Sequence, residues 1–399
     1  MGTRGFFYRE HITLEEGTKM KHVRGNVHLM KEINRATILS LLHREKAMSR
    51  ADMAKVTKLS ATTVSSLVDE LIDEGYIVES GAQSSAGAGR KAIRLEISKD
   101  KGFVISVGLG NHLFYCTLSN FHSEIVAELT VPAVKGNDEV LQTILHCISE
   151  IVQLAGISDF SQIKGIGIAS PGIVDESSGT ITYARFLQLK DFEIVKLLQA
   201  RYVHLPVYVM NDTNAAAYAE YYRETSPGVK HVLYVWVYEG VGARMIVNGQ
   251  VYSGYKGRAG EVSLLHDRWF SIAYVLEQAK QRAAKRGLPV PHTIEDVVQA
   301  YERGEDWIEP LMNRSLLFLS RALAVMMNLF GPEKTILDGW FMMSPKCMQR
   351  IHDHLARFTV DGGYDSSWVA PASLGKRNYV IGVTTMVLQQ LFKGKVSVT

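Results

Sequence analysis

Apolar residues recur at helical spacing between residues 60 and 73. They fall at i, i+3, i+4, i+7 and i+8, so they share one face of a helix. These positions are Val64, Leu67, Val68, Leu71 and Ile72. Ser60 is a suitable N-cap before them, and Gly75 is a suitable C-cap after them. The pattern therefore predicts a helix from Ser60 to Asp73.

A shorter helix is predicted directly upstream. Ser49 is followed three residues later by the carboxylate of Asp52, which is close to the capping-box pattern of a helix N-terminus. Only the short segment 56–59 separates this helix from the next one. A short helix, a tight turn and a second helix make a helix-turn-helix. Apolar positions between Val27 and Leu42 predict a further helix in front of it.

The outward face of the helix that starts at Ser60 is small, hydroxyl-rich and uncharged near its N-terminus, which suits a recognition helix in a DNA major groove. Apolar residues at 76–78 and 93–97 predict two strands, and the glycine-rich loop between them would be a wing that reaches a minor groove. The expected DNA contacts are Ser49, Arg50, Ser60, Thr62, Thr63, Ser65, Ser66, Arg90 and Lys91. The alternative is an ordinary helical subdomain with a flexible loop.

The charge balance agrees with DNA binding by this segment. Residues 1–100 contain 16 Lys+Arg and 13 Asp+Glu, a balance of +3, whereas the other 299 residues contain 28 of each. Positive charge is what contact with phosphates requires. Residues 1–25 show no periodicity, so we expect a mobile arm; a basic arm that contacts DNA is the alternative.

Composition narrows the class of protein. The chain has 399 residues, of which 46% are hydrophobic and 21% charged, as in globular proteins of two or three domains. No apolar run approaches the roughly 20 residues that span a bilayer, and the N-terminus lacks the apolar region of a secretory signal. The three cysteines match no metal-ligand spacing. We expect a cytoplasmic protein that uses neither a membrane, a metal nor a cofactor.

From Lys99 onward, predicted strands and helices alternate, which indicates an α/β fold. Two segments, 103–118 and 232–247, share one order: an apolar strand, Gly-x-Gly, and a second apolar strand. Such turns bring backbone N–H groups close to an anion. The repeat predicts two similar lobes with a cleft between them.

Polar residues follow one of the later strands. The strand Val207–Met210 ends at Asn211 and Asp212, and a helix is expected from Ala215 to Tyr222. Ligands bind at this position in α/β proteins. Glu261 lies in a glycine-bracketed loop, 257–261, where the sequence places no cationic partner beside it. We expect these three polar residues to bind a ligand; for Asp212, a helix N-cap is the alternative.

Together these segments resemble the ROK family (repressors, open reading frames and sugar kinases). The resemblance covers the chain from about Asn34 to Phe392. It rests on Asn34-Arg35-Ala36-Thr37-Ile38-Leu39, Ser49-Arg50-Ala51-Asp52, Leu59-Ser60, Thr63-Val64-Ser65, Glu74-Gly75, Gly89-Arg90-Lys91, Ser170-Pro171-Gly172-Ile173-Val174-Asp175, Asn211-Asp212-Thr213-Asn214-Ala215-Ala216 and Ala259-Gly260-Glu261. Two sets of motifs in the right order make the resemblance specific.

The resemblance implies an α/β fold: an N-terminal winged helix-turn-helix followed by a two-lobed, actin-like (ribonuclease H-like) sugar-kinase-type domain, usually dimeric. We accordingly expect an arm at 1–25, a DNA-binding domain at 26–98 and a first lobe at 99–208. The second lobe would span 209–377, and the C-terminal helix within 378–399 would complete the first lobe.

The kinase residues of the family are incomplete in this chain. Kinases of the family carry an aspartate in the first phosphate loop, where this chain has Gly108, and Gly-Thr-Gly in the second, where it has Glu239. Phosphoryl transfer needs cradled phosphates and a carboxylate for Mg²⁺, and a glutamate beside phosphates is repulsive. The zinc motif is also missing: Leu264 replaces its histidine, and His266 is expected at the surface. We therefore expect no enzymatic activity, although Asp212 matches the catalytic base.

The sugar-binding part of the resemblance is preserved only in part, because Leu264 replaces a sugar-contacting histidine and the family's usual Asn and Trp are missing from 184–190. It implies that Asn211, Asp212 and Glu261 hold sugar hydroxyls, with a carbohydrate as effector. Arg185 or Lys190 would favour an anionic effector such as a sugar phosphate if they faced the pocket; the alternative is that both lie on a solvated face.

We therefore expect a regulator, a repressor of carbohydrate-related genes, that binds operator DNA as a homodimer or higher homo-oligomer and has a catalytically silent sensor domain. Two alternatives stay open at this point. One is an ATP-dependent sugar kinase with an appended DNA-binding domain. The other is a sensor domain that has lost its ligand and serves only as a scaffold.

Overall fold

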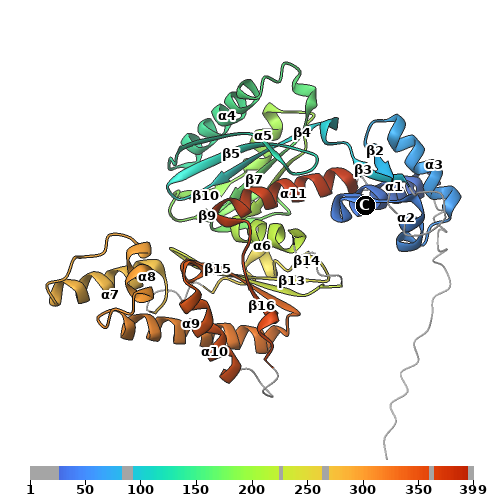
Figure 1. Cartoon of the computed structure of the whole chain (residues 1–399). Coiled ribbons are helices and arrows are strands. Elements are labelled where there is room, and N and C mark those ends of the chain that lie inside the picture. The colour runs from blue at the N-terminus through green and yellow to red at the C-terminus, as the bar shows by residue number, and fades with distance from the viewer. Residues whose placement is uncertain (1–26, 83–92, 224–227, 263–268, 359–363, 394–399) are drawn as a thin grey trace, which may run out of the picture.

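In the computed structural model, the described residues are 27–82, 93–223, 228–262, 269–358 and 364–393. Within these ranges the chain forms a small N-terminal domain, here called the head (residues 27–97), and two larger lobes (Figure 1). The elements of the head are α1 (Val27–Glu45), β1 (Ala47–Met48), α2 (Arg50–Thr57), α3 (Ala61–Asp73), β2 (Ile77–Ala82) and β3 (Ile93–Ile97). Its strands pair antiparallel in the order β1-β3-β2. The expected winged helix-turn-helix fold is therefore confirmed.

The caps predicted in the head are present. The hydroxyl of Ser49 accepts the Asp52 amide at 3.2 Å, and that of Ser60 accepts the Thr63 amide at 3.1 Å. After α3, Gly75 has φ +76° and donates its amide to the Ile72 carbonyl, while the Tyr76 amide reaches Leu71. This is the Schellman arrangement, and its positive φ favours glycine. The caps fix where α2 and α3 begin and where α3 ends.

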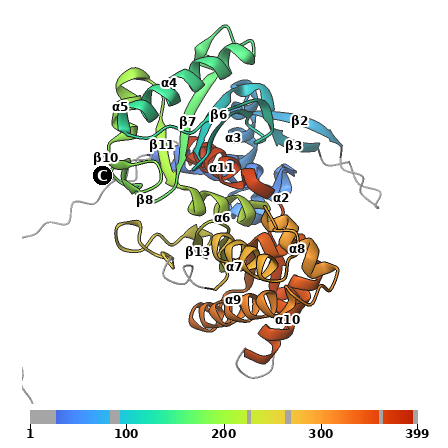
Figure 2. The ribbon, with the colours of Figure 1, turned by 90° about the vertical axis from the view of Figure 1, so that its left-hand side faces the viewer.

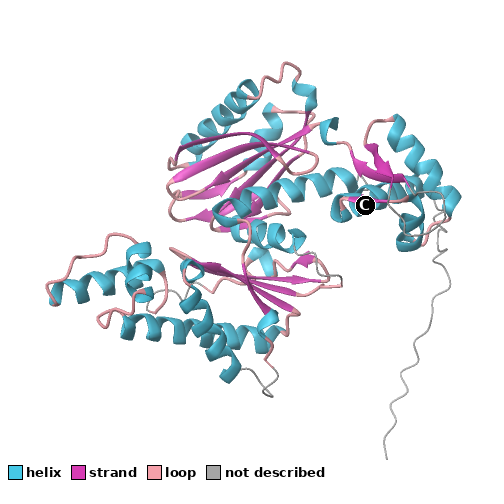
Figure 3. Ribbon diagram, in the orientation of Figure 1, coloured by secondary structure: helices cyan, strands magenta, loops and turns pink. Residues whose placement is uncertain are grey.

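The first lobe contains a five-stranded sheet in the order β11-β7-β4-β5-β6. Its strands are β4 (Phe103–Leu109), β5 (Leu113–Asn120), β6 (Ile125–Pro132), β7 (Ile163–Ser170) and β11 (Val207–Asn211). The helices α4 (Asn137–Leu154) and α5 (Ile194–Arg201) lie on its outer side (Figure 3). A small antiparallel sheet is formed by β8 (Ile173–Asp175), β9 (Thr180–Ala184) and β10 (Leu189–Phe192).

The second lobe repeats this strand order. Its sheet runs β16-β15-β12-β13-β14, so each lobe has an antiparallel hairpin whose first strand also pairs with a parallel strand. The strands are β12 (Val232–Val237), β13 (Val241–Val247), β14 (Gln250–Val251), β15 (Lys334–Gly339) and β16 (Val369–Pro371). The helices are α6 (Asp212–Arg223), α7 (Ile272–Lys285), α8 (Ile294–Glu302), α9 (Glu309–Phe330) and α10 (Pro345–Phe358). The repeat seen in the sequence is therefore a structural repeat.

Short 3₁₀ turns connect several of these elements. They span Lys99–Lys101, Phe160–Gln162, Tyr255–Gly257, Trp340–Met343, Ser366–Trp368 and Gly375–Arg377. None of the helices in the described ranges is long and apolar enough to cross a membrane.

The last helix, α11 (Asn378–Lys393), joins the three parts of the protein. It packs against α6 between the two sheets, against β4 and β7 of the first lobe, and against α1 of the head (Figure 2). Near its C-terminal end, the ring of Phe392 lies 5.3 Å from His43 of α1 and 5.6 Å from Phe121 of the first lobe. One buried cluster therefore contains side chains of the head, of α6 and of α11.

Candidate functional site

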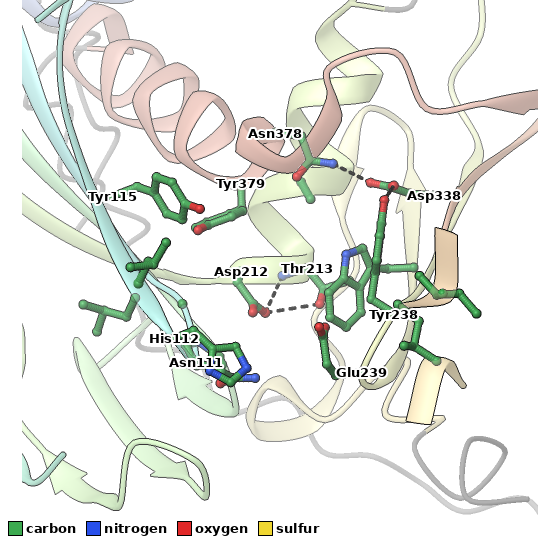
Figure 4. Close-up of a pocket in the computed structure, with 18 of the residues that line it drawn as sticks. Asn111, His112, Tyr115, Asp212, Thr213, Tyr238, Glu239, Asp338, Asn378 and Tyr379 are labelled. Carbon is green, nitrogen blue, oxygen red and sulfur yellow. Dashed lines mark hydrogen bonds between the residues drawn. The ribbon is translucent and has the colours of Figure 1, made fainter. Parts of the chain in front are cut away.

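A cavity of about 520 Å³ opens between the two lobes (Figure 4). Its lining comes from the glycine-containing hairpins of both lobes, from the N-terminal ends of α6 and α11, and from α7 and α8. Most of the lining is apolar or aromatic. These residues are Leu109, Leu113, Tyr115, Pro171, Ala216, Trp236, Tyr238, Ile272, Leu276, Ile294, Met343 and Tyr379. We call this space the aromatic cavity.

Gly108, where the family's kinases carry an aspartate, has no room for a side chain. A Cβ atom built there would lie 2.7 Å from Cγ2 of Val380 and closer still to the ring of Tyr379. The Tyr379 ring packs edge-on against Tyr115, with centroids 6.3 Å apart. An aspartate at this position would therefore require α11 or its side chains to move.

Among the described residues that line the cavity, the carboxyl groups belong to Asp212, Glu239, Glu295 and Asp338, His112 carries an imidazole, and there is no lysine or arginine. Asp338 accepts hydrogen bonds from Tyr234 (2.6 Å), Tyr238 (2.7 Å) and Asn378 (2.7 Å). Burial and the adjacent Asp338 raise the pKa values of both tyrosines, so they remain donors. A phosphate in this cavity would meet repulsion from these carboxylates.

A polar cluster adjoins the cavity at the end of β11. The side-chain oxygen of Asn211 accepts the Asn214 amide at 3.0 Å, and its amide nitrogen donates to the Gly172 carbonyl at 2.8 Å. Asn211 is therefore the cap of α6, which begins at Asp212 rather than at Ala215 as expected. The prediction placed the helix start too late because Thr213 and Asn214 are poor helix formers that the cap overrides.

Arg244 of β13 is the residue that sequence reasoning missed. It is only 3% exposed, and its Nη2 donates to Glu261 Oε1 at 2.7 Å and to Asn211 Oδ1 at 3.2 Å. The expectation that Glu261 has no cationic partner is wrong, because β13 brings the guanidinium to it from 17 residues away. A single arginine inside the apolar strand Val241–Val247 was the available signal, since a buried charge is normally paired.

Asp212 connects the polar cluster with the aromatic cavity. Its Oδ1 accepts the Thr213 amide at 2.6 Å and the Thr213 hydroxyl at 3.2 Å. Burial raises the pKa of this carboxyl to about 6; the hydrogen bonds from Thr213 and the charge of Arg244 oppose the shift, and Glu261 adds to it. The group is poised to change charge near neutral pH.

Two families match the sequence. Residues 104–263 match the ROK family, and residues 32–91 match the MarR family. The segment that matches the ROK family therefore follows a segment that matches the MarR family and lies in the head.

Curated relatives of the chain are named as a sugar repressor or as a transcriptional regulator. The chain is 37% identical over 240 residues to the putative xylose repressor of Caldicellulosiruptor sp. (strain Rt8B.4), which covers 60% of this chain and 59% of that one. It is 27% identical over 336 residues to the DNA-binding transcriptional dual regulator NagC of Escherichia coli (strain K12), covering 79% and 82%. The first match thus spans less than two thirds of the relative's length.

Solved structures share the fold of this chain. A ROK family transcriptional regulator described as a homolog of the E. coli MLC protein superposes with a TM-score of 0.78 at 23% identity, covering 92% of this chain and 98% of that one. A ROK family glucokinase from Streptomyces griseus, in complex with glucose and AMPPNP, superposes with a TM-score of 0.59 at 19% identity, covering 71% and 99%. The match to the regulator covers more of this chain than the match to the glucokinase, and it includes the head.

In the head, the candidate DNA-binding side chains differ in exposure. Thr62 and Ser66 of α3 are exposed, and the first turn of α3 contains no acidic residue. Ser60 hydrogen-bonds the hydroxyls of Thr62 and Thr63, each at 2.8 Å. Ser65 and Thr63 are partly exposed. The open face of α3 is thus the hydroxyl-rich face expected from the sequence.

The remaining candidate residues of the head form other interactions or lie outside the described residues. Ser49 is buried and its hydroxyl bonds Asp52 at 2.7 Å, while Arg50 forms an ion pair with Asp69 at 2.7 Å. Arg90 and Lys91 lie outside the described residues. Ser49 therefore positions α2, and Arg50 would have to exchange a carboxylate for a phosphate to contact DNA.

Other residues singled out in the sequence lie away from the cavity or cannot be placed. Arg185 and Lys190 are exposed and are not among the residues that line it. Leu264 and His266 lie outside the described residues, as does the arm 1–25. Within the described ranges, no group of three or more His, Cys, Asp or Glu side chains is arranged to hold a metal ion.

The raised pKa of Asp212 has a measurable consequence for stability. Its carboxyl binds a proton more tightly in the folded state, where the pKa is about 6, than at its ordinary value of 3.8. Raising the pH from about 4 to 6 should therefore lower the free energy of unfolding, by about 1 to 3 kcal/mol from this group. Urea unfolding of wild type and Asp212→Asn across this range measures the difference. Parallel pH curves for the two proteins would contradict the prediction.

Proposed function

We propose that this protein is a DNA-binding transcriptional regulator, a repressor of carbohydrate-related genes, whose ROK domain binds a carbohydrate effector without phosphorylating it. The names of its relatives, the winged helix domain and the cleft between the lobes support this reading. We retain the division into a DNA-binding domain at 26–98, a first lobe at 99–208 with 378–399, and a second lobe at 209–377.

The ring of Tyr379 over Gly108 is the observation on which the absence of kinase activity rests. It fills the space of the missing aspartate, so neither that carboxylate nor a Mg²⁺ ion held by it has room there. On the opposite side of the cavity, Glu239 adds a negative charge where nucleotide phosphates would lie. Phosphoryl transfer depends on positioned phosphates and on charge neutralisation, and this cleft supports neither.

The proposed effector site is the polar cluster: Asn211, Asp212 and Glu261, together with Arg244. Carboxylates and amides suit vicinal hydroxyls, because each group can bond two neighbouring hydroxyls. Arg244 holds Asn211 and Glu261 in fixed positions through Nη2. Its Nε is buried and has no hydrogen-bond partner among the described residues, so the cluster retains donor capacity.

The proposed DNA contacts are made by the open face of α3. Ser60, Thr62, Thr63, Ser65 and Ser66 would face base edges and phosphates, while Arg50 and the wing residues Arg90 and Lys91 would add phosphate or minor-groove contacts. A homodimer would place two such helices on a pseudo-palindromic operator.

Effector binding would change DNA affinity only if it favours one arrangement of the lobes over another. The helix α11 gives a physical route for this effect, because Asn378 and Tyr379 line the cavity and Phe392 packs on the head. A change in the cleft that moves α11 would thus alter how the head packs against the C-terminal end of this helix.

The test is binding of the full chain to promoter DNA flanking its own gene, followed by fluorescence anisotropy with and without a panel of neutral sugars. We expect sequence-selective binding that a neutral carbohydrate changes, and no sugar-dependent ATP hydrolysis in a coupled assay. Absence of sequence-selective binding under all conditions would refute the regulator. Sugar-dependent ATP turnover that Asp212→Asn abolishes would establish the kinase alternative instead.

A further inference from the structure

The aromatic cavity is too large and too apolar to be explained by the polar cluster alone. Its volume of about 520 Å³ lies within the roughly 300–1,000 Å³ of sites that enclose small organic ligands. It begins at Asp212, which belongs to both the cluster and the cavity, and extends to Trp236, Ile272 and Ile294. A ligand held by the cluster can therefore continue into it past Asp212.

Aromatic rings line this cavity on both sides. Trp236 and Tyr238 of the second lobe have centroids 5.2 Å apart, and Tyr115 and Tyr379 stand opposite on the first lobe (Figure 4). Large rings offer flat apolar surface for another ring, while hydroxyl and carboxylate groups at the edges take up hydrogen bonds. The combination suits a sugar ring or an aryl ring that carries few charges.

The charges of the cavity exclude other ligand classes. The described lining carries the carboxylates of Asp212, Glu239, Glu295 and Asp338 without a lysine or arginine. A phosphate or carboxylate ligand would meet like charges at close range, a cost of about 1 to 4 kcal/mol for each pair at 4 Å. An anionic ligand is therefore disfavoured, whereas an uncharged ligand meets no such repulsion.

We propose that the effector is an uncharged glycoside of two ring units: one sugar ring on the polar cluster, and a second glycosyl or aryl ring in the aromatic cavity against Trp236 and Tyr238. This inference rests on the proposed effector-sensing function and names its ligand class. In a kinase of the family, the sugar hydroxyl beside the residue that matches Asp212 would be phosphorylated. In this chain, the second ring would be attached to the sugar at that position.

Calorimetric titration of the full chain with paired probes tests the proposal. The pairs are D-xylose with xylobiose and with p-nitrophenyl β-D-xyloside, and D-glucose with cellobiose and with p-nitrophenyl β-D-glucoside; glucose 6-phosphate is the charged probe. At least one two-ring probe should bind about tenfold or more tightly than its monosaccharide, because the second ring adds buried apolar surface and ring stacking. The phosphate should bind no better than glucose.

Variants assign the effect to the cavity. Trp236→Ala should weaken two-ring binding about tenfold and leave monosaccharide binding within about twofold, whereas Trp236→Phe keeps a ring and should stay close to wild type. Leu113→Trp, at a partly exposed position of the lining, should block the second ring without disturbing the core. Trp368→Ala, an exposed tryptophan away from the lining, is the matched control.

Equal affinity for a monosaccharide and its two-ring partners would overturn the inference, as would Trp236→Ala weakening both equally. Failure of every probe to bind would also overturn it. The proposed function is tested separately. If a monosaccharide changes operator affinity, the proposal of a regulator holds even when the two-ring proposal fails. If the sugar-free protein does not bind the operator, only the proposal of a regulator is refuted.

Discussion

Replacing Ser66 with glutamate is expected to weaken operator binding about 100-fold. Ser66 is exposed on the half of α3 that lacks acidic residues, so a carboxylate there would face the phosphates or base edges of a bound duplex. Repulsion at close range costs about 1 to 4 kcal/mol per pair, and two such pairs reach the expected loss. Fluorescence anisotropy with operator DNA at fixed ionic strength measures the change.

The matched control is Thr182→Glu, which places the same charge at an exposed position of β9 in the first lobe. It should leave operator affinity unchanged, because the added carboxylate lies on the first lobe and not on α3. Since both variants have the same net charge, a difference between them reports the position of the charge. Ser66→Ala should have a small effect, since it removes a hydroxyl without adding charge. Unchanged binding by the glutamate variant at position 66 would mean that α3 does not enter the groove.

Truncating Phe392 to alanine is expected to have the second largest effect. The side chain is 2% exposed and lies between His43 of the head and Phe121 of the first lobe. Its loss leaves a cavity where three parts of the protein meet, at a cost of about 3 to 5 kcal/mol for a buried phenylalanine. The head should unfold or detach at lower urea concentration, and the effect of a sugar on operator affinity should largely disappear.

Limited proteolysis between head and first lobe, together with anisotropy titrations with and without sugar, measures both consequences. Phe160→Ala is the control, because Phe160 stacks on Tyr202 at 5.5 Å in the first lobe, and its side chain is 38% exposed. A Phe392→Ala protein whose operator affinity still responds to sugar as wild type does would show that the signal takes another route.

Local chemistry made much of this fold predictable. The caps at Ser49 and Ser60 and the glycine turn at Gly75 are read from neighbours within a few residues, and the structure has all three. The two hairpins repeat in sequence because each lobe needs the same strand pairing. Periodicity over short windows carries this information.

Long-range partners were not predictable in the same way. Arg244 bonds Glu261, 17 positions further along the chain, and Asn211 at the end of β11 in the sheet of the first lobe, and Tyr379 reaches Gly108 across 271 positions of sequence. No local pattern encodes which side chain fills a space left by another. The family resemblance identified Gly108 as the position of the missing aspartate. Only the structure shows that α11 packs too closely on Gly108 to leave room for that side chain.

The packing of α11 on Gly108 also has a consequence for whether substitutions could introduce phosphoryl transfer into this chain. In this chain Gly108→Asp would drive a carboxylate into the ring of Tyr379 and the methyl of Val380, and the same α11 continues to the seat of the head. Reversion would therefore need a smaller residue at 379 in the same step, and that residue would remove a ring from the effector cleft. If the cavity binds the proposed effector, each single substitution on this route would weaken effector binding before it made room for a phosphate, so selection for effector binding would oppose the route.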